Sequence, residues 1–100
     1  MRKIEKQMIQ AILDRTNWKG ANTEVKHSVN SGINYADIYL HSHHIATVSP
    51  DTFKYAPFGK ANEKTFMEWP TATTRSRLRA LGVNASIREG HACIDGIMIV

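Results

Sequence analysis

Residues 70–82 read Pro-Thr-Ala-Thr-Thr-Arg-Ser-Arg-Leu-Arg-Ala-Leu-Gly, and they carry the clearest helix signals of the chain. A proline and a cluster of threonine hydroxyls open the stretch, which is typical of a helix N-terminus. Leu78 and Leu81 stand three residues apart as an apolar stripe, and Gly82 is placed to end the helix as its C′ residue. We therefore predict a short helix with one apolar side.

Arg75, Arg77 and Arg79 crowd into this helix, and we expect them at its N-terminal end. That end is already partly positive, and normally favours acidic residues. The pattern predicts an anion site, in which helix N–H groups, guanidinium forks and the hydroxyls of Thr73 and Thr74 hold the ligand together. Alternatively, arginine is simply a good helix former on a solvated face. Arg75 and Arg79 share one side of a helix and Arg77 points elsewhere, so at most two of the three can grip one ligand.

The composition predicts one folded domain covering residues 1–100, because 42% of the residues are hydrophobic. Thirteen Lys and Arg against nine Asp and Glu leave a formal net charge of +4. This charge permits nucleic acid or an acidic protein as partner but does not choose between them. Cys93 is the only cysteine, so no intrachain disulfide can form. With no signal peptide and no apolar run of the ~18 residues that span a membrane, we expect a soluble cytoplasmic protein that makes no membrane contact.

The N-terminal part reads as a helix from Lys3 to about Arg15, because its apolar residues recur every three or four positions. The turn formers of residues 16–22 break it. Trp18 lies among them, either as a cover over the core or as an exposed stacking residue beside Lys19.

The middle of the chain predicts antiparallel strands at residues 22–29, 33–41 and 44–48. A two-residue turn at Ser42-His43 would pair Leu40 with Ile45 towards the core. The same register places His41 opposite His44, and Tyr39 on their side of the sheet.

Later elements are less regular. Residues 52–56 predict a short strand in which Phe53 and Tyr55 share a face, and Pro57 ends it. Residues 58–69 read either as a loop or as a helical turn over 61–69. Hairpin turns are expected at Glu89-Gly90 and Asp95-Gly96.

Together these elements predict an α+β fold in the order α-β-β-β-β-α-β-β, with a small antiparallel sheet and two helices packed on one face. The sheet face of Leu40, Ile38 and Ile45 is expected to meet the apolar helix residues Ile4, Met8, Ile12, Leu78 and Leu81.

Three segments together resemble a family of small tailed-bacteriophage proteins: Asn17-Trp18-Lys19 with Asn22-Thr23, Tyr39 to Ala46, and Thr71 to Leu81. That family is similar in having Trp before Gly-Asn-Thr, a Leu-His-Gly-Asn hairpin turn and a Thr-x-Thr-Thr-Lys-Ser-Arg-Leu-Asn-Ala-Leu helix. Here Ser42-His43 replaces Gly-Asn, and Arg75 and Arg79 replace Lys and Asn, which makes this helix more basic. The resemblance implies action inside a bacterial cell and carries no activity with it.

The sequence offers little for catalysis or cofactors. His41, His43 and His44, with His91 and Cys93, are of the types that bind zinc, but their spacing fits no usual zinc pattern, so we expect no metal. No arrangement for nucleophilic catalysis and no phosphate-binding loop stands out, and we expect no cofactor and no enzyme activity.

The sequence therefore favours a binding function, for which there are two hypotheses. In the first, the chain is a phage protein that inhibits or modulates a host protein or a defence complex such as a CRISPR effector. It would bind through its arginines or through Tyr39, His41 and His44. In the second it is a small nucleic-acid-binding protein whose arginines and Lys19 contact phosphates while Trp18, Tyr39 or Trp69 stacks on bases. The modest charge favours the first, and a homo-oligomer is compatible with either.

Overall fold

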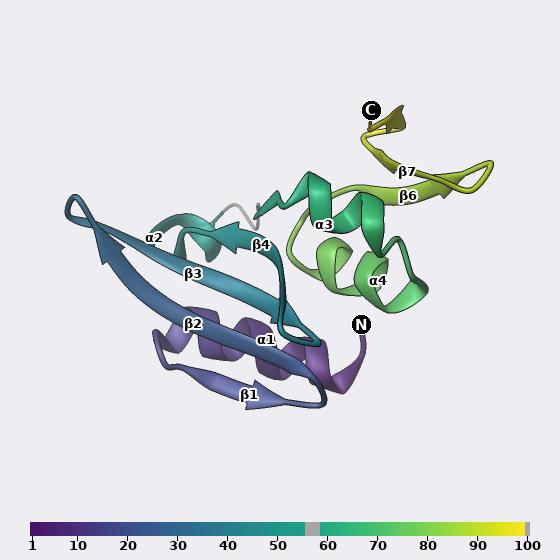
Figure 1. Cartoon of the computed structure of the whole chain (residues 1–100). Coiled ribbons are helices and arrows are strands. Elements are labelled where there is room, and N and C mark those ends of the chain that lie inside the picture. Colours follow the sequence, from purple (N-terminus) through teal and green to yellow (C-terminus); the bar gives the residue numbers. More distant parts are fainter. Residues whose placement is uncertain (56–58, 100) are drawn as a thin grey trace.

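A computed structural model describes residues 1–55 and 59–99 as a mixed α+β protein with two antiparallel sheets (Figure 1). The fold class predicted from the sequence is confirmed, although within these described residues the strands form two sheets and the helices number four. In chain order the elements are α1 (Lys3–Asp14), β1 (Trp18–Gly20), β2 (Thr23–Asn30), β3 (Ile33–Leu40), β4 (His43–Val48), α2 (Pro50–Phe53), β5 (Gly59–Ala61), α3 (Glu63–Glu68), α4 (Ala72–Ala80), β6 (Ala85–Arg88), β7 (His91–Ile94) and β8 (Ile97–Met98).

The larger sheet holds β1 to β5 in sequence order, and α1 packs against β1 and β2. α4 contacts both α1 and β4, so the two longest helices close one core with this sheet. The expected packing is confirmed: Ile38 and Ile45 are buried in one cluster with Met8, Ile12, Leu78 and Leu81, while Ile4 is half-buried. Burial of such side chains is the main stabilising contribution to a fold of this size.

The smaller sheet, β6-β7-β8, lies at the opposite end of the molecule from the tip of the β2–β3 hairpin (Figure 1). Its turns at Glu89-Gly90 and Asp95-Gly96 are confirmed, and all four residues have positive φ, as a two-residue hairpin turn requires. Ala85 and Ala92 of this sheet belong to the same buried cluster as the larger sheet. The two sheets are therefore joined through one core.

The β3–β4 hairpin differs from its predicted register. The turn consists of His41 and Ser42, with φ of 50° and 66°, so Leu40 pairs with His43 and Tyr39 with His44. The pairings of Leu40 with Ile45 and of His41 with His44 are therefore wrong. The reason is the position of the turn, one residue earlier than predicted. Further along the hairpin a β-bulge leaves Ile45 unpaired between the Tyr39–His44 and Ile38–Ala46 pairs. The bulge lets two consecutive residues, Ile45 and Ala46, both face the core.

Two other predictions are corrected. The break expected after α1 contains a strand, because Trp18 pairs with Val25 in β1 and packs partly buried against the core. The strand predicted over residues 52–56 is wrong: Pro50 begins helix α2, where its fixed φ and missing N–H suit the first helical position. Phe53 is buried there and Tyr55 is 82% exposed. Pro57 and Phe58 lie outside the described residues.

Between Gly59 and Trp69 the helical alternative is correct in part. A short strand, β5, pairs with β4, and α3 then begins after Asn62, whose side-chain oxygen accepts a hydrogen bond from the N–H of Thr65 at 3.2 Å. An asparagine cap of this kind satisfies one of the free N–H groups at a helix start.

Helix α4 is capped at both ends by the predicted signals. The hydroxyl of Thr71 accepts a hydrogen bond from the Thr74 N–H at 3.1 Å, and Gly82 takes the left-handed conformation with φ of 88°. The N–H groups of Gly82 and Val83 return to the carbonyls of Arg79 and Leu78, which is a Schellman motif. The helix is therefore fixed as a nine-residue element from Ala72 to Ala80.

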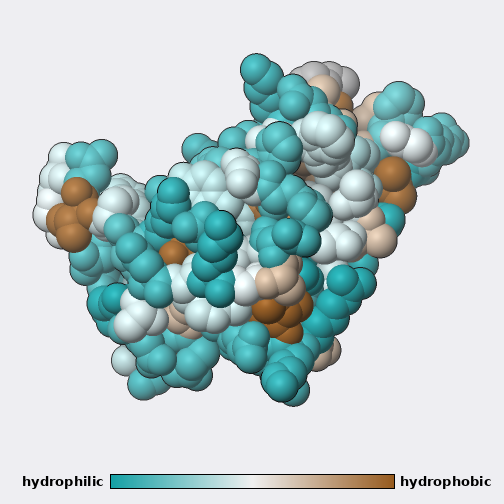
Figure 2. Space-filling view, turned by 60° about the horizontal axis from the view of Figure 1, so that its bottom comes forward, coloured by the Kyte–Doolittle hydropathy of each residue, from teal (hydrophilic) through white to brown (hydrophobic). Residues whose placement is uncertain are grey.

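The surface is mostly hydrophilic on the face seen in Figure 2, with apolar side chains at separate places. One apolar patch lies at the end where Figure 1 places the β2–β3 hairpin, and Val29 and Ile33 of that hairpin are 68% and 47% exposed. Within residues 1–55 and 59–99, no helix has the length and apolar character needed to cross a membrane.

Candidate functional site

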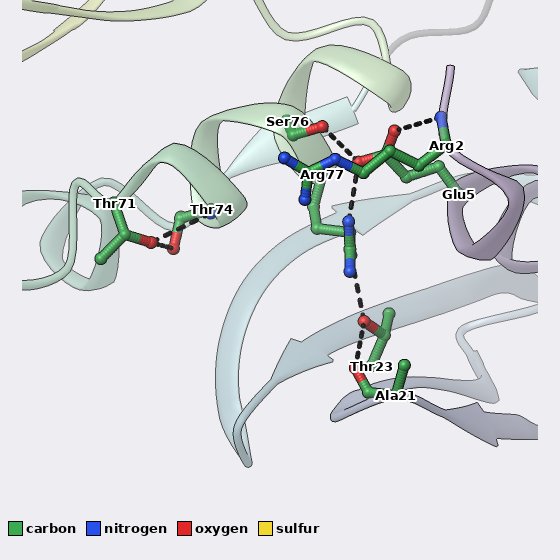
Figure 3. A network of polar contacts seen from close by, with 8 residues as sticks. All are labelled: Arg2, Glu5, Ala21, Thr23, Thr71, Thr74, Ser76 and Arg77. Carbon is green, nitrogen blue, oxygen red and sulfur yellow. Dashed lines mark hydrogen bonds and ion pairs between the residues drawn. The ribbon is translucent and has the colours of Figure 1, made fainter.

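Arg77 is not a surface residue. Its guanidinium lies between α1 and β2, where Nη1 donates to the Glu5 carboxylate at 2.8 Å and Nε donates to the Thr23 hydroxyl at 3.1 Å (Figure 3). The side chains of Arg77 and Glu5 are only 5% and 3% exposed. A buried pair with these hydrogen bonds ties three elements together, and leaves Arg77 little freedom to contact a partner.

The Glu5 carboxylate is the centre of this network (Figure 3). Besides Arg77, the Ser76 hydroxyl donates to it, and so does the backbone N–H of Arg2 at 3.2 Å. Burial by itself raises the pKa of Glu5, but the hydrogen bonds from Ser76 and Arg77 outweigh burial and leave that pKa below its ordinary value. Glu5 is therefore ionised at neutral pH, and its carboxylate is already engaged by the donors of this network.

The arginines do not crowd the N-terminal end of the helix, and this part of the prediction is wrong. Because α4 spans only Ala72–Ala80, Arg77 and Arg79 lie in its last turn, and Arg75 lies one turn after the Thr71 cap. Cations are favoured near a helix C-terminus, so the helix dipole does not oppose these charges. An anion site must therefore be argued from the surface around the arginines and not from the helix end.

Arg75 and Arg79 do share a face of α4, as the helical spacing predicts, and they line a cleft of ≈ 440 Å³ between α4 and the start of α1. We call this the arginine cleft; its lining residues are Met1, Arg2, Glu5, Ala72, Arg75, Ser76, Arg79 and Ala80. Arg75 Nε donates to the Thr71 carbonyl at 3.4 Å, and Arg79 Nε to the Ala85 carbonyl at 2.7 Å. Within residues 1–55 and 59–99, none of the guanidinium groups of Arg2, Arg75 and Arg79 pairs with a carboxylate.

The arginine cleft continues into an apolar hollow of ≈ 430 Å³, which shares Met1, Arg79 and Ala80 with it. Ile9 and Leu13 of α1 and Phe53 of α2 line this second part. Helices α1 and α4 thus border one groove that is basic at one end and apolar at the other.

A second cleft lies on another side of α4, among the β3–β4 turn, α3 and the first turn of α4. We call it the Trp69 cleft; it measures ≈ 490 Å³ and is lined by Leu40, His41, His43, Ile45, Thr65, Trp69, Thr71, Thr73 and Thr74. The rings of His43 and Trp69 stack with centroids 5.2 Å apart and planes inclined by 27°. Here the structure brings together His41, Thr73 and Thr74, three of the predicted binding residues.

His44 belongs to a separate network on β3 and β4. Its Nε2 lies 3.1 Å from Asp37 Oδ1 and 3.0 Å from Thr47 Oγ1, and its Nδ1 lies 3.1 Å from the Asn62 amide nitrogen. Because one nitrogen faces both Asp37 and Thr47, the ring cannot relay a proton between them as in a catalytic triad. The arrangement instead connects the sheet to the cap of α3 through Asn62.

The other predicted site residues are dispersed. Tyr39 lies beside His44 at 5.4 Å between ring centroids, and the Lys26 ammonium lies 5.2 Å from the Tyr39 ring. Trp18 and Lys19 lie on the edge strand β1 and line neither cleft. In the part of the chain that the structure describes, no three His, Cys, Asp or Glu residues lie close enough together to hold a metal ion.

Arg2 and Glu5 are residues of this candidate site that the sequence did not predict. Glu5 is an acidic residue in the first turn of α1, which the sequence does signal, since such residues suit a helix start. Its pairing with Arg77 joins positions 72 residues apart. No local sequence pattern predicts this contact. None predicts that Arg2, Arg75 and Arg79 line one cleft either.

Comparison with known proteins gives one finding on the family. The model of a protein family described as Kyanoviridae Gp96 protein matches residues 1–98 of the chain. No curated protein and no solved structure matches it.

Proposed function

Since the chain belongs to the Kyanoviridae Gp96 protein family, a family of phage proteins, we propose that it is a small phage accessory protein that binds an acidic protein of the host cell and inhibits or modulates it. Its binding surface in this proposal is the arginine cleft. The observation that carries the proposal is the meeting of Arg2, Arg75 and Arg79 around one cleft without carboxylate partners among the described residues.

The charges in the cleft do not cancel. Glu5 is the one carboxylate that lines it, and that carboxylate is already bound by Arg77 and Ser76 from the protein interior. Three guanidinium groups therefore remain to attract an anionic partner. Guanidinium forks bind carboxylates in pairs of parallel hydrogen bonds, which gives such contacts both strength and direction.

The groove favours a protein over a nucleic acid as the partner. Its far end is mainly apolar, through Ile9, Leu13 and Phe53, although Lys54 also lines it. A protein segment with acidic and apolar residues matches both ends of the groove, whereas a phosphate backbone leaves the apolar surface uncovered. The formal charge of +4 is also small for a protein that depends on releasing counterions from nucleic acid.

Nucleic-acid binding is the second candidate, and one observation favours it. Trp69 is 48% exposed and lies on the Trp69 cleft, so its ring is available to stack on a base while the arginines contact phosphates.

The test is a pulldown from host lysate with three tagged proteins: the natural chain, the double variant Arg75→Glu with Arg79→Glu, and the control Lys60→Glu with Lys64→Glu. Lys60 and Lys64 are exposed and line neither the arginine cleft nor the Trp69 cleft, so the control changes the net charge equally. A host protein retained by the natural chain and the control but lost by the arginine variant, and then bound again as purified components, supports the proposal.

Equal capture of the host protein by all three tagged proteins would contradict the proposed function.

Nuclease treatment of the lysate, and binding to random DNA and RNA at two salt concentrations, distinguish nucleic-acid binding from protein binding. Steep salt dependence that vanishes in the arginine variant would favour nucleic acid.

A further inference from the structure

We propose that the Trp69 cleft is the pocket for an aromatic side chain of the same acidic partner, next to the carboxylates that the arginine cleft binds. This inference rests on the proposed function and deepens it, because it names a second chemical feature of the partner. It predicts a protein segment in which a tryptophan or tyrosine stands close to glutamate or aspartate.

The lining of the cleft suits a flat, mainly apolar group. Apart from the imidazoles of His41 and His43, its nine lining residues carry only apolar, indole or hydroxyl side chains. The floor is apolar, with Leu40 and Ile45 both buried, and the wall is the indole of Trp69. Aromatic rings pair favourably with one another in offset or tilted arrangements, and an aromatic residue that fills a pocket often dominates a protein interface.

The indole of Trp69 is held in position before any ligand arrives. The His43 ring stacks against it at 5.2 Å, and the proline that follows Trp69 in the chain restricts its backbone. A side chain that is already ordered loses less conformational entropy on binding, which raises affinity.

Threonine hydroxyls supply the polar part of the pocket. Thr71 and Thr74 are engaged with each other at the helix cap, with 2.9 Å between their hydroxyl oxygens. Thr73 also lines the cleft, and within residues 1–55 and 59–99 its hydroxyl makes no hydrogen bond. It can therefore pair with an indole N–H or a phenol hydroxyl, the polar handles of tryptophan and tyrosine.

The two clefts are close enough to serve one segment of a partner. The first turn of α4 separates them: Thr71, Thr73 and Thr74 line the Trp69 cleft, and Ala72, Arg75 and Ser76 line the arginine cleft. The Arg75 guanidinium bends back to the carbonyl of Thr71 at 3.4 Å, so a cation that has no carboxylate partner among the described residues lies beside a residue of the aromatic pocket. Charge complementarity then places the acidic residues of the partner next to its aromatic residue.

The experiment uses the full chain and three short labelled peptides, measured by fluorescence anisotropy. One peptide is rich in glutamate with a single tryptophan, the second has alanine in place of the tryptophan, and the third keeps the tryptophan among glutamines. We expect the glutamate–tryptophan peptide to bind at least about tenfold more tightly than the glutamate–alanine peptide. Trp69→Ala should abolish that difference, whereas Tyr55→Ala, which removes an exposed aromatic ring elsewhere, should retain it.

Equal binding of the two glutamate peptides, or a preference that survives in Trp69→Ala, would overturn the aromatic pocket while leaving the arginine cleft intact. If glutamate confers no gain over glutamine, or Arg75→Glu with Arg79→Glu binds as the natural chain does, the proposed function itself fails. Absence of binding by all three peptides overturns both proposals.

Discussion

On helix α4, Arg77 and its two neighbours Arg75 and Arg79 occupy opposite environments. Arg77 lies inside the protein, with its charge matched by Glu5 and its Nε bound to Thr23. Arg75 and Arg79 lie on the face that borders the arginine cleft, where the Nε–H of each donates a hydrogen bond to a backbone carbonyl. The position of each arginine therefore depends on the helical period and not on its residue type. Residues two apart in a helix point to different sides.

The same contrast applies to the ion pairs. The buried pair Glu5–Arg77 and the exposed pair Asp51–Arg15 have similar chemistry, but the side chains of the exposed pair are 47% and 50% accessible. Solvent and salt screen the exposed pair, whereas the buried pair has no water to replace a lost partner.

The largest loss of stability is expected for Arg77→Ala. It leaves the Glu5 carboxylate buried without its cation, and we expect a loss of about 3–5 kcal/mol in the free energy of unfolding. Denaturant titration measures this loss. In the double variant with Glu5→Gln the cost should be smaller than the sum of the single changes, since the buried charge is then absent. A loss below about 1 kcal/mol for Arg77→Ala would show that the pair is not structural.

An intermediate loss is expected at the start of the same helix. Thr71→Ala removes the hydroxyl that caps the Thr74 N–H, and such caps contribute about 1 kcal/mol. Thr73→Ala is the matched control, because its hydroxyl makes no hydrogen bond within the described residues. Equal unfolding curves for the two variants would contradict the assigned cap.

A smaller, pH-dependent effect should identify Glu5. Because the folded state lowers the pKa of Glu5 below its ordinary value, the ionised carboxylate stabilises the fold at neutral pH. That contribution is complete above the pKa that Glu5 has in the unfolded chain. It is lost as the pH falls through the lower pKa that Glu5 has in the folded protein. Denaturant titrations between pH 7 and pH 3 should show a steeper acid loss for the natural chain than for Glu5→Gln. Parallel curves would exclude Glu5 as the group responsible.

The smallest change in stability is expected for Arg75→Ala. Its guanidinium has no carboxylate partner among the described residues, so unfolding should change by no more than about 0.5 kcal/mol. Binding of the glutamate-rich peptides should nevertheless weaken, because the cleft loses one of its cations. If Arg75→Ala destabilises the protein as strongly as Arg77→Ala, the separation between the two sides of α4 is wrong.

Much of the fold was accessible from the sequence where the signals were local. The caps of α4, the α1 stripe and the turns at Glu89-Gly90 and Asp95-Gly96 each rest on a few neighbouring residues, and the structure confirms them. The β-bulge at Ile45 and the start of α2 at Pro50 were missed. The bulge accompanies the burial of two consecutive residues, Ile45 and Ala46, and an alternating strand pattern does not predict such a pair.

The site was only partly accessible for the same reason. Helical spacing separated Arg75 and Arg79 from Arg77 correctly, but the expected position of all three at the helix start was wrong, because α4 ends at Ala80 and so places Arg77 and Arg79 in its last turn. Arg2 and Glu5 reach the site through the packing of α1 against α4, and the contacts of Glu5 with Ser76 and Arg77 join positions 71 and 72 residues apart. Contacts of this kind depend on tertiary structure, and they leave no periodic pattern in the sequence.

The two sides of α4 are tested most directly by an NMR titration of the arginine Nε–H resonances with the glutamate–tryptophan peptide. Arg75 and Arg79 should shift progressively to saturation, while Arg77 should stay unmoved because its Nε–H remains bound to Thr23 inside the protein. Unchanged resonances of Arg75 and Arg79, or a shift of Arg77 as large as theirs, would contradict the division of α4 into a structural side and a binding side.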